Sequence, residues 1–153
     1  MDKAELGRRC QSGDVDYVKA ALDEHGACEV FDNRLNGYSG CIHAATEKGK
    51  IPVLDFLIRN GEDINRKRYG GTEWTPLHCA VWQIDEEKRL KTVDFLLQKG
   101  AEVDAPDSDQ MTPLFYAAEY GRAETARLLL LAGAKVEAKD KRGETPLRWA
   151  IRK

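Results

Sequence analysis

Apolar residues recur at helical spacing in three similar segments of the chain, 53–61, 93–100 and 126–133. In each segment many of the apolar positions lie three or four residues apart, which is typical of a helix with one face against a core. Each segment also ends on a glycine, the residue most often found just after the last turn of a helix. The spacing therefore predicts three equivalent helices along the chain.

A Thr-Pro pair followed by apolar residues forms a second pattern, which reads TPLHCA from Thr75, TPLFYA from Thr112 and TPLRWA from Thr145. Threonine is a good N-cap, because its hydroxyl can accept a hydrogen bond from a free amide, and proline fits the first helical position. Thr112 and Thr145 are 33 residues apart, whereas Thr75 and Thr112 are 37 apart, the same period with four residues added. A fixed period in this range marks a repeat array.

Two further units lie upstream. One begins at Gly40 with GCIHAA, which keeps the apolar, histidine and alanine positions but lacks Thr-Pro. The other begins near Ala4 with a polar helix ending near Gly13, followed by a second helix predicted over 15–24 that closes near Gly26. A terminal repeat is expected to be polar on its outer face, which has no neighbour. We therefore predict a single domain, 1–153, made of the units 4–39, 40–74, 75–111, 112–144 and a half unit 145–153.

These phased units, with their helix-ending glycines, resemble the ankyrin repeat family along nearly the whole chain. The resemblance implies an all-α solenoid of stacked helix-turn-helix pairs, with β-hairpin loops that project roughly at right angles. It also implies a concave groove between those loops and the first helix of each pair. A single helix pair cannot bury its own apolar face, so we expect most of the stability to come from contacts between neighbouring units.

The third unit departs from the pattern because it holds four extra residues within 84–91. Four residues are about one helical turn. We expect the first helix of this unit to run one turn longer, since Glu, Lys, Arg and Leu favour helix. The alternative is a charged bulge between the two helices.

Two other departures concern a loop and the end of the chain. The loop 65–74 is two residues longer than the period allows, and its basic and aromatic composition suggests a contact surface. After the first helix of the half unit the chain stops. Either this short helix is the cap of the array, or the chain is a piece of a longer array.

Charge and composition exclude several classes of function. The chain has 24 Lys and Arg against 26 Asp and Glu, evenly divided between its halves, whereas a nucleic-acid binder needs a basic stripe. No apolar run is long enough to cross a bilayer, and the N-terminus lacks the apolar region of a signal peptide. The four cysteines form no Cys-x-x-Cys pair, which favours a reducing compartment. We predict a cytoplasmic location, with the nucleus as the alternative.

Two histidines could suggest chemistry, because His43 and His78 each lie close to a cysteine and could form zinc sites. Both occupy the fourth position of the repeat motif, where the resemblance implies hydrogen bonds within and between repeats, and we favour that structural role. No nucleophile elbow, phosphate-binding loop or His-Glu-x-x-His motif occurs in the chain. We therefore predict no enzymatic activity, no metal and no cofactor.

By resemblance, partner contacts come from the residue before each Thr-Pro position, from the loops and from exposed positions of the first helices. Tyr, Trp, Met and Arg, which several of these positions carry, are enriched at interface centres. The alternative for Tyr116 is half-buried packing, and for Trp149 a role as a cap. The candidate partner-binding residues are Tyr38, Glu47, Lys48, Arg68, Tyr69, Glu73, Trp74, Trp82, Gln83, Met111, Tyr116, Glu119, Tyr120 and Arg142.

The loops also differ in charge, which could orient a partner with a matching arrangement. One tip is expected to be basic through Arg66, Lys67 and Arg68, and the next to be acidic through Asp104, Asp107 and Asp109.

Together these features predict a monomeric, non-catalytic module that binds a partner protein or peptide through the groove and the loops, and neither nucleic acid nor a membrane. The alternative is a targeting or regulatory ankyrin domain of a larger enzyme complex, of the ubiquitin-ligase or kinase type, with the catalytic part elsewhere.

Overall fold

The computed structural model describes residues 2–31 and 40–152. The described part of the chain contains nine helices and no β-strand, which confirms the all-α repeat fold. The helices are α1 (Lys3–Ser12), α2 (Val15–Phe31), α3 (Cys41–Glu47), α4 (Ile51–Arg59), α5 (Pro76–Trp82), α6 (Glu86–Gln98), α7 (Pro113–Glu119), α8 (Ala123–Leu131) and α9 (Pro146–Ala150).

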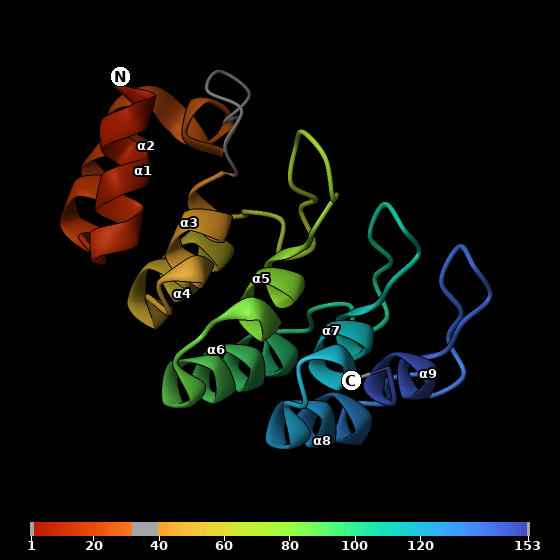
Figure 1. The fold of residues 1–153 in the computed structure, drawn as a ribbon. Coiled ribbons are helices and arrows are strands. Elements are labelled where there is room, and N and C mark those ends of the chain that lie inside the picture. The colour runs from red at the N-terminus through yellow and green to blue at the C-terminus, as the bar shows by residue number, and fades with distance from the viewer. Residues whose placement is uncertain (1, 32–39, 153) are drawn as a thin grey trace.

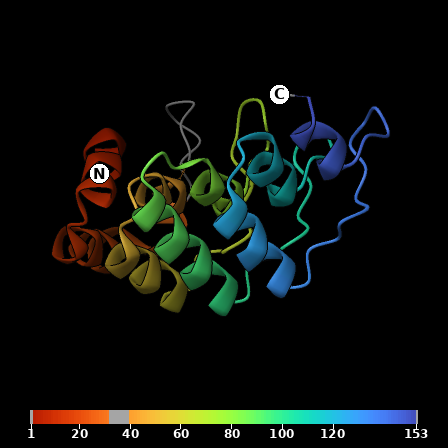
Figure 2. The ribbon, with the colours of Figure 1, turned by 60° about the horizontal axis from the view of Figure 1, so that its bottom comes forward.

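The helices stack in two layers (Figure 1). The first helices of the units, α1, α3, α5, α7 and α9, contact one another in that order, and α6 contacts α8 in the second layer. Figure 2 shows α4, α6 and α8 running side by side. The loops after α4, α6 and α8 project from the same side of the array (Figure 1). We call these loops the first, second and third fingers, and the side formed by the first helices and the fingers the groove face.

The fingers turn back on themselves without forming strands. One backbone bond closes each of them: from Arg68 N–H to Trp74 O at 2.8 Å in the first finger, and from Asp107 N–H to Met111 O at 3.0 Å in the second. In the third finger the bond runs from Asp140 N–H to Glu144 O at 3.0 Å. In the second and third fingers a turn bond accompanies the closing bond, from Gln110 N–H to Asp107 O at 3.1 Å and from Gly143 N–H to Asp140 O at 2.9 Å. None of the described finger residues forms a strand, so the projecting loops are present but the predicted β-hairpins are not found among the described residues.

The core consists of two clusters of buried apolar side chains. The N-terminal core cluster includes Leu6, Ile42, Leu54 and Leu57. The C-terminal core cluster includes Leu77, Leu96, Phe115 and Leu129. Ile58 and Phe95 pack against both. Each cluster draws its members from adjacent helix pairs, as expected for an array stabilised by neighbour contacts.

The threonines begin their helices through backbone conformation more than through their hydroxyls. Thr75, Thr112 and Thr145 are all extended, with ψ between 163° and 167°, and each precedes a proline at the start of the helix. The hydroxyls of Thr112 and Thr145 make no capping bond. The prediction that the threonine hydroxyl accepts a bond from a free amide is therefore wrong for Thr112 and Thr145, whereas Thr75 accepts from the backbone of His78 in a capping box. The extended threonine and the fixed φ of proline are enough to begin the turn.

The four extra residues of the third unit lengthen the second helix, so the prediction of a longer first helix is wrong. Helix α5 has seven residues, as α3 and α7 do, whereas α6 has 13 against nine in α4 and α8. The chain leaves α5 at Gln83, whose ψ is 138°. Asp85 then begins α6 by accepting a hydrogen bond from the Lys88 amide at 3.0 Å. An aspartate N-cap placed there starts the new helix before α5 can continue.

Two arginines hold the junction between α5 and α6. The buried Arg89 guanidinium donates to Gln83 O at 2.9 Å and to Thr125 Oγ1 at 3.0 Å. Arg122 donates to Val81 O and, at 2.9 Å, to Gln83 O. Cations at the C-terminal end of a helix satisfy free carbonyls and interact favourably with the helix dipole. These arginines therefore fix the end of α5, a role that the sequence pattern did not suggest.

The second helix of the first unit is longer than predicted. It continues through Gly26 to Phe31 instead of ending near Gly26. Gly13, in contrast, does end α1, with φ at 90° in the left-handed region. A glycine inside a helix costs only about 1 kcal/mol relative to alanine, so Gly26 does not by itself stop the helix.

Glu62 is a buried carboxylate at a position where the later units have Ala101 and Ala134, directly after the helix-ending glycine. Its Oε1 accepts a 2.6 Å bond from the Arg66 guanidinium, whereas its Oε2 has no partner. Burial raises the pKa of Glu62, although Arg66 opposes that effect. The charged form is therefore less favourable in the folded protein than in the unfolded chain.

Replacing Glu62 by alanine is expected to raise the unfolding free energy by about 1 kcal/mol at pH 7, as substitutions toward a repeat consensus often do. Because the folded pKa lies above the unfolded one, the penalty is complete above the folded pKa and disappears below the unfolded pKa. The gain should therefore shrink as the pH falls toward 4. Urea unfolding at pH 7 and pH 5 measures the decrease, with the exposed Glu102→Ala as control. A loss of stability at pH 7 would contradict this account.

Candidate functional site

Four aromatic side chains meet on the groove face. Trp82 lies 5.3 Å from Trp74 and 4.8 Å from Tyr120, and Trp74 lies 5.0 Å from Tyr116, measured between ring centroids. We call Trp74, Trp82, Tyr116 and Tyr120 the aromatic cluster. Trp82 and Tyr120 are 43% and 38% exposed. Edge-to-face pairs contribute roughly 0.5–1.5 kcal/mol each beyond their buried area, so the cluster holds its two exposed rings in place.

The inner half of the cluster is fixed by hydrogen bonds. Trp74 Nε1 donates to the Tyr116 hydroxyl at 3.1 Å, and that hydroxyl donates to Asp107 Oδ2 at 2.5 Å. The other oxygen of Asp107 accepts the amides of Asp109 and Met111 at 2.8 and 2.9 Å. Burial and the Asp107 carboxylate raise the pKa of Tyr116. Asp107 therefore braces the second finger against the aromatic cluster.

The same brace recurs in the third finger. Asp140 accepts the amides of Arg142 and Glu144 at 2.9 and 2.8 Å, and its Oδ2 accepts from Trp149 Nε1 at 3.0 Å. The prediction did not assign this role. An aspartate five residues before Thr-Pro and an aromatic residue four after that threonine, repeated with a period of 33, are the sequence signal for it.

The fingers are less contrasted in charge than the sequence suggested. Asp107 is only 2% exposed, and Asp104 accepts a 2.9 Å bond from the Lys135 amide. On the first finger, Lys67 pairs with Glu73 and Arg68 with Glu47, both at 3.1 Å. The basic side chains Lys67 and Arg68 of the first finger are thus paired with carboxylates, whereas the bonds to Asp104 and Asp107 come from uncharged groups and leave their negative charges in place.

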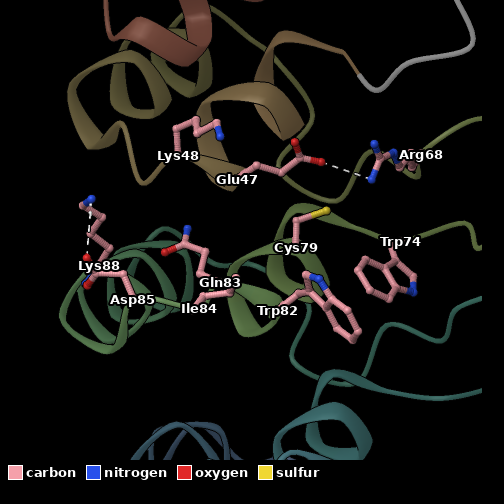
Figure 3. Close-up of a pocket in the computed structure, with 10 residues that line it drawn as sticks. All are labelled: Glu47, Lys48, Arg68, Trp74, Cys79, Trp82, Gln83, Ile84, Asp85 and Lys88. Carbon is pink, nitrogen blue, oxygen red and sulfur yellow. Dashed lines mark hydrogen bonds and ion pairs between the residues drawn. The ribbon is translucent and has the colours of Figure 1, made fainter.

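A hollow of about 470 Å³ opens between α3 and α5, beside the aromatic cluster (Figure 3). We call it the α3–α5 hollow. The Glu47–Arg68 ion pair lies on one side of Cys79, and Trp74 and Trp82 lie on the other (Figure 3). The residues that line the hollow are Glu47, Lys48, Arg68, Trp74, Cys79, Trp82, Gln83, Ile84, Asp85 and Lys88.

The structure brings together one part of the predicted set of contact residues. Six of its members line the α3–α5 hollow: Glu47, Lys48, Arg68, Trp74, Trp82 and Gln83. Tyr120 adjoins them through Trp82. Tyr69 and Glu73 line a separate hollow in the first finger, and Arg142 lies in the third finger near Met111. Glu119 ends α7 and is partly buried, and Tyr38 lies outside the described residues.

Burial separates three predicted residues from the others. Gln83, Met111 and Tyr116 are each no more than 9% exposed, so they support the surface instead of forming it. The residues of the hollow that the prediction missed are Cys79, Ile84, Asp85 and Lys88. Ile84, which is 93% exposed, could have been suspected as an apolar residue inside a charged stretch.

Three cysteines (Cys10, Cys41 and Cys79) and the two motif histidines (His43 and His78) are buried. Burial raises the pKa of the Cys79 thiol to about 12, so the thiol is protonated at neutral pH and a poor nucleophile. His43 Nε2 lies 3.1 Å from Trp74 O and His78 Nε2 lies 3.2 Å from Met111 O, which confirms the predicted bonds between repeats. Within residues 2–31 and 40–152, no three His, Cys, Asp or Glu side chains are grouped so that they could hold a metal ion. None of the described helices is long and apolar enough to cross a membrane.

Stacked helix pairs with fingers on one side define a tandem helical-repeat protein. The family model described as ankyrin repeats (3 copies) matches residues 6–107 and 86–153, and the chain belongs to the ankyrin repeat family.

Several curated proteins resemble the chain over part of its length. Ankyrin repeat and SOCS box protein 6 of Mus musculus is 34% identical over 117 residues, which cover 76% of this chain and 25% of that protein. The NF-kappa-B inhibitor cactus of Drosophila melanogaster is 40% identical over 79 residues (50% of this chain, 16% of that protein). Rabankyrin-5 of Mus musculus is 36% identical over 96 residues (53% and 8%). The chain thus spans between 8% and 25% of the length of these relatives.

Proposed function

We propose that this protein is a non-catalytic module that binds a partner protein or peptide through its groove face. Ankyrin repeats are in general protein–protein interaction modules. One relative, cactus, is named as an inhibitor of another protein, NF-kappa-B. The observation that carries the proposal is the aromatic cluster beside the α3–α5 hollow.

Folding leaves apolar surface uncovered at this place. Trp82 and Ile84 remain exposed and line the hollow, and the exposed Tyr120 contacts Trp82. Covering such side chains is favourable by about 25 cal/mol per Å² of apolar area removed from water. Trp82 is already held by its ring contacts, so its side chain would lose little conformational entropy when a partner binds. Trp and Tyr are also the residue types that most often dominate binding energy.

The proposed contact surface has a centre and a periphery. Glu47, Lys48, Arg68, Trp74, Trp82 and Tyr120 form the centre. Tyr69, Glu73, Glu119 and Arg142 are proposed as peripheral contacts. The protein acts in the cytoplasm as a monomer in this proposal, and it binds neither nucleic acid nor a membrane.

A second candidate function is a targeting or regulatory domain of a larger enzyme complex, of the ubiquitin-ligase or kinase type. The observation in its favour is that the matched relatives are four or more times longer than the matched segment. In that case the same groove face binds the protein to be targeted, and the catalytic part lies on another segment or subunit.

The double variant Trp82→Ala/Tyr120→Ala is expected to reduce partner binding about tenfold or more, as removal of interface aromatics commonly does. Proteins captured from cell extract on immobilised wild type and variant are compared by quantitative mass spectrometry. Leu131→Ala is the control, because Leu131 is 73% exposed on α8, outside the groove face. If the captured proteins survive the double change and are lost with Leu131→Ala, the groove face is not the binding surface.

A further inference from the structure

The α3–α5 hollow exists because of one residue choice in the third unit. Cys79, Tyr116 and Trp149 all stand four residues after the threonine that begins their helix. The two aromatic members each bond to the bracing aspartate of the finger that precedes their helix, Asp107 and Asp140 respectively. Cys79 is much smaller and leaves the corresponding space open.

The first finger, which precedes the third unit, also differs from the later fingers. The closing bond of the second finger runs from Asp107 to Met111, and in the first finger it runs from Arg68 to Trp74. An arginine therefore stands where the bracing aspartate would be, and its side chain turns to Glu47 on α3, 3.1 Å away. The third unit thus lacks both the aromatic side chain and its acceptor, and Trp74 and Trp82 border the open space.

The charges around the hollow favour an acidic ligand over a basic one. The carboxylates are already engaged: Glu47 binds Arg68, and Asp85 caps α6 and lies 3.4 Å from Lys88 Nζ. Lys48 is exposed and pairs with none of the described carboxylates. The lining therefore carries one uncompensated positive charge, on a chain whose net charge is −2.

We propose that the hollow binds an aromatic side chain from an acidic peptide segment, with a carboxylate near that residue pairing with Lys48. The partner thus supplies the aromatic ring that the third unit lacks, against two indole faces and the soft Cys79 sulfur. Charge complementarity of this kind sets orientation and specificity. This inference rests on the proposed function and specifies the chemistry of its partner.

A random 12-residue peptide library displayed on phage is selected against the immobilised wild-type protein. The expected result is enrichment of peptides with a Trp, Tyr or Phe flanked within three residues by Asp or Glu. One consensus peptide is then synthesised, and its affinity is measured by fluorescence polarisation. Cys79→Tyr, which copies Tyr116, should fill the hollow and weaken binding at least tenfold.

Lys48→Glu keeps the test decisive if Cys79→Tyr does not fold, because position 48 is exposed. It should weaken binding about tenfold and reverse the preference for acidic residues in a repeated selection. The matched control is Lys91→Glu, since Lys91 is exposed on α6 outside the lining of the hollow. It should leave the affinity unchanged.

Selection of basic peptides, selection of no consensus, or full binding to the Lys48→Glu variant would overturn the inference. These outcomes are distinct from failure of the proposed function. If extract proteins still depend on Trp82 and Tyr120 while no acidic aromatic peptide is selected, the groove face binds a partner of different chemistry. If the Trp82→Ala/Tyr120→Ala variant also captures the same extract proteins as the wild type, both proposals fail.

Discussion

Lowering the pH from 7.5 to 4 is expected to reduce the unfolding free energy by roughly 3 kcal/mol for each of two buried histidines. His43 and His78 are both completely buried. Burial lowers the pKa of His43 to about 4 and that of His78 to about 4. A combined loss on this scale is a large part of the stability of a domain, so we expect acid unfolding in this range.

Burial is the main reason why His78 prefers its neutral form, and its bond from the Thr75 amide also requires that form. The Thr75 amide donates to Nδ1 at 3.2 Å, so Nδ1 must be unprotonated, and Nε2 lies 3.2 Å from Met111 O as its donor. A second proton would turn Nδ1 from acceptor to donor and break the first bond. Asp107 opposes the shift in the pKa of His78, but burial is the larger effect.

The sign of the effect follows from the two pKa values. Each histidine has a folded pKa of about 4, below its ordinary value of 6.5. In the unfolded chain the histidines bind protons below pH 6.5, whereas in the folded protein they do so only near pH 4. Their contribution is therefore complete above pH 6.5 and is lost as the pH falls toward 4. Glu62 works in the opposite direction over the lower part of this range and offsets a smaller share.

Urea titrations followed by circular dichroism at pH 7.5, 6 and 5 measure this loss. A His78→Gln variant serves as control, since glutamine can donate and accept but does not titrate. It should be less stable than wild type at pH 7.5 and lose only about half as much on acidification. A urea midpoint that stays constant from pH 7.5 to pH 5 would show that the buried histidines do not govern the pH dependence.

Asp107→Ala is expected to lower the unfolding free energy by about 3 kcal/mol, because three donors lose their acceptor at once. These donors are the Tyr116 hydroxyl and the amides of Asp109 and Met111. Asp107 is 2% exposed, so water cannot replace the carboxylate without opening the finger. The loss should also loosen Trp74, which donates to the Tyr116 hydroxyl.

The matched control is Asp109→Ala in the same finger. The Asp109 side chain is 69% exposed and has only a 3.7 Å ion pair with Lys141, which surface measurements place at or below about 1 kcal/mol. Chemical denaturation gives both values, and tryptophan fluorescence reports the surroundings of Trp74. Equal effects of the two substitutions would refute the brace.

The repeated motifs in the sequence identified the family, and the resemblance to that family implied the fold. The Thr-Pro pairs, the helix-ending glycines and the apolar spacing place α3 to α9 in their units, because each signal acts locally and repeats in phase. The role of His43 and His78 also followed from their position in the motif. The all-α array of neighbouring pairs was therefore predictable before any coordinates.

Two helix boundaries were predicted wrongly, because they depend on contacts with residues distant in the sequence or on a choice between two adjacent helices. The extra turn joins α6 because Asp85 caps that helix and Arg89 reaches back to the end of α5. Helix propensity alone does not tell which of two adjacent helices takes an inserted turn. The prediction that α2 ends near Gly26 is wrong, because a glycine in the sequence does not end a helix unless the chain also leaves the helical conformation there, commonly for the left-handed one.

The candidate site was predicted in part. Trp74 and Trp82 were singled out by residue type and position, and both line the hollow. The hollow itself could not be inferred from types, because it is the absence of a large side chain at Cys79. Comparing the same position across the units, where Tyr116 and Trp149 stand, is the step that reveals it.

The α3–α5 hollow has a consequence for the mechanics of the array. Helix α3 belongs to the N-terminal core cluster and α5 to the C-terminal one, and among the described residues Ile58 and Phe95 pack against both. A ligand in the hollow touches residues of both α3 and α5, one helix from each cluster. The binding free energy is lost if either half unfolds, so a bound ligand couples the unfolding of the two halves. The ligand-bound protein is therefore expected to unfold in a single cooperative transition.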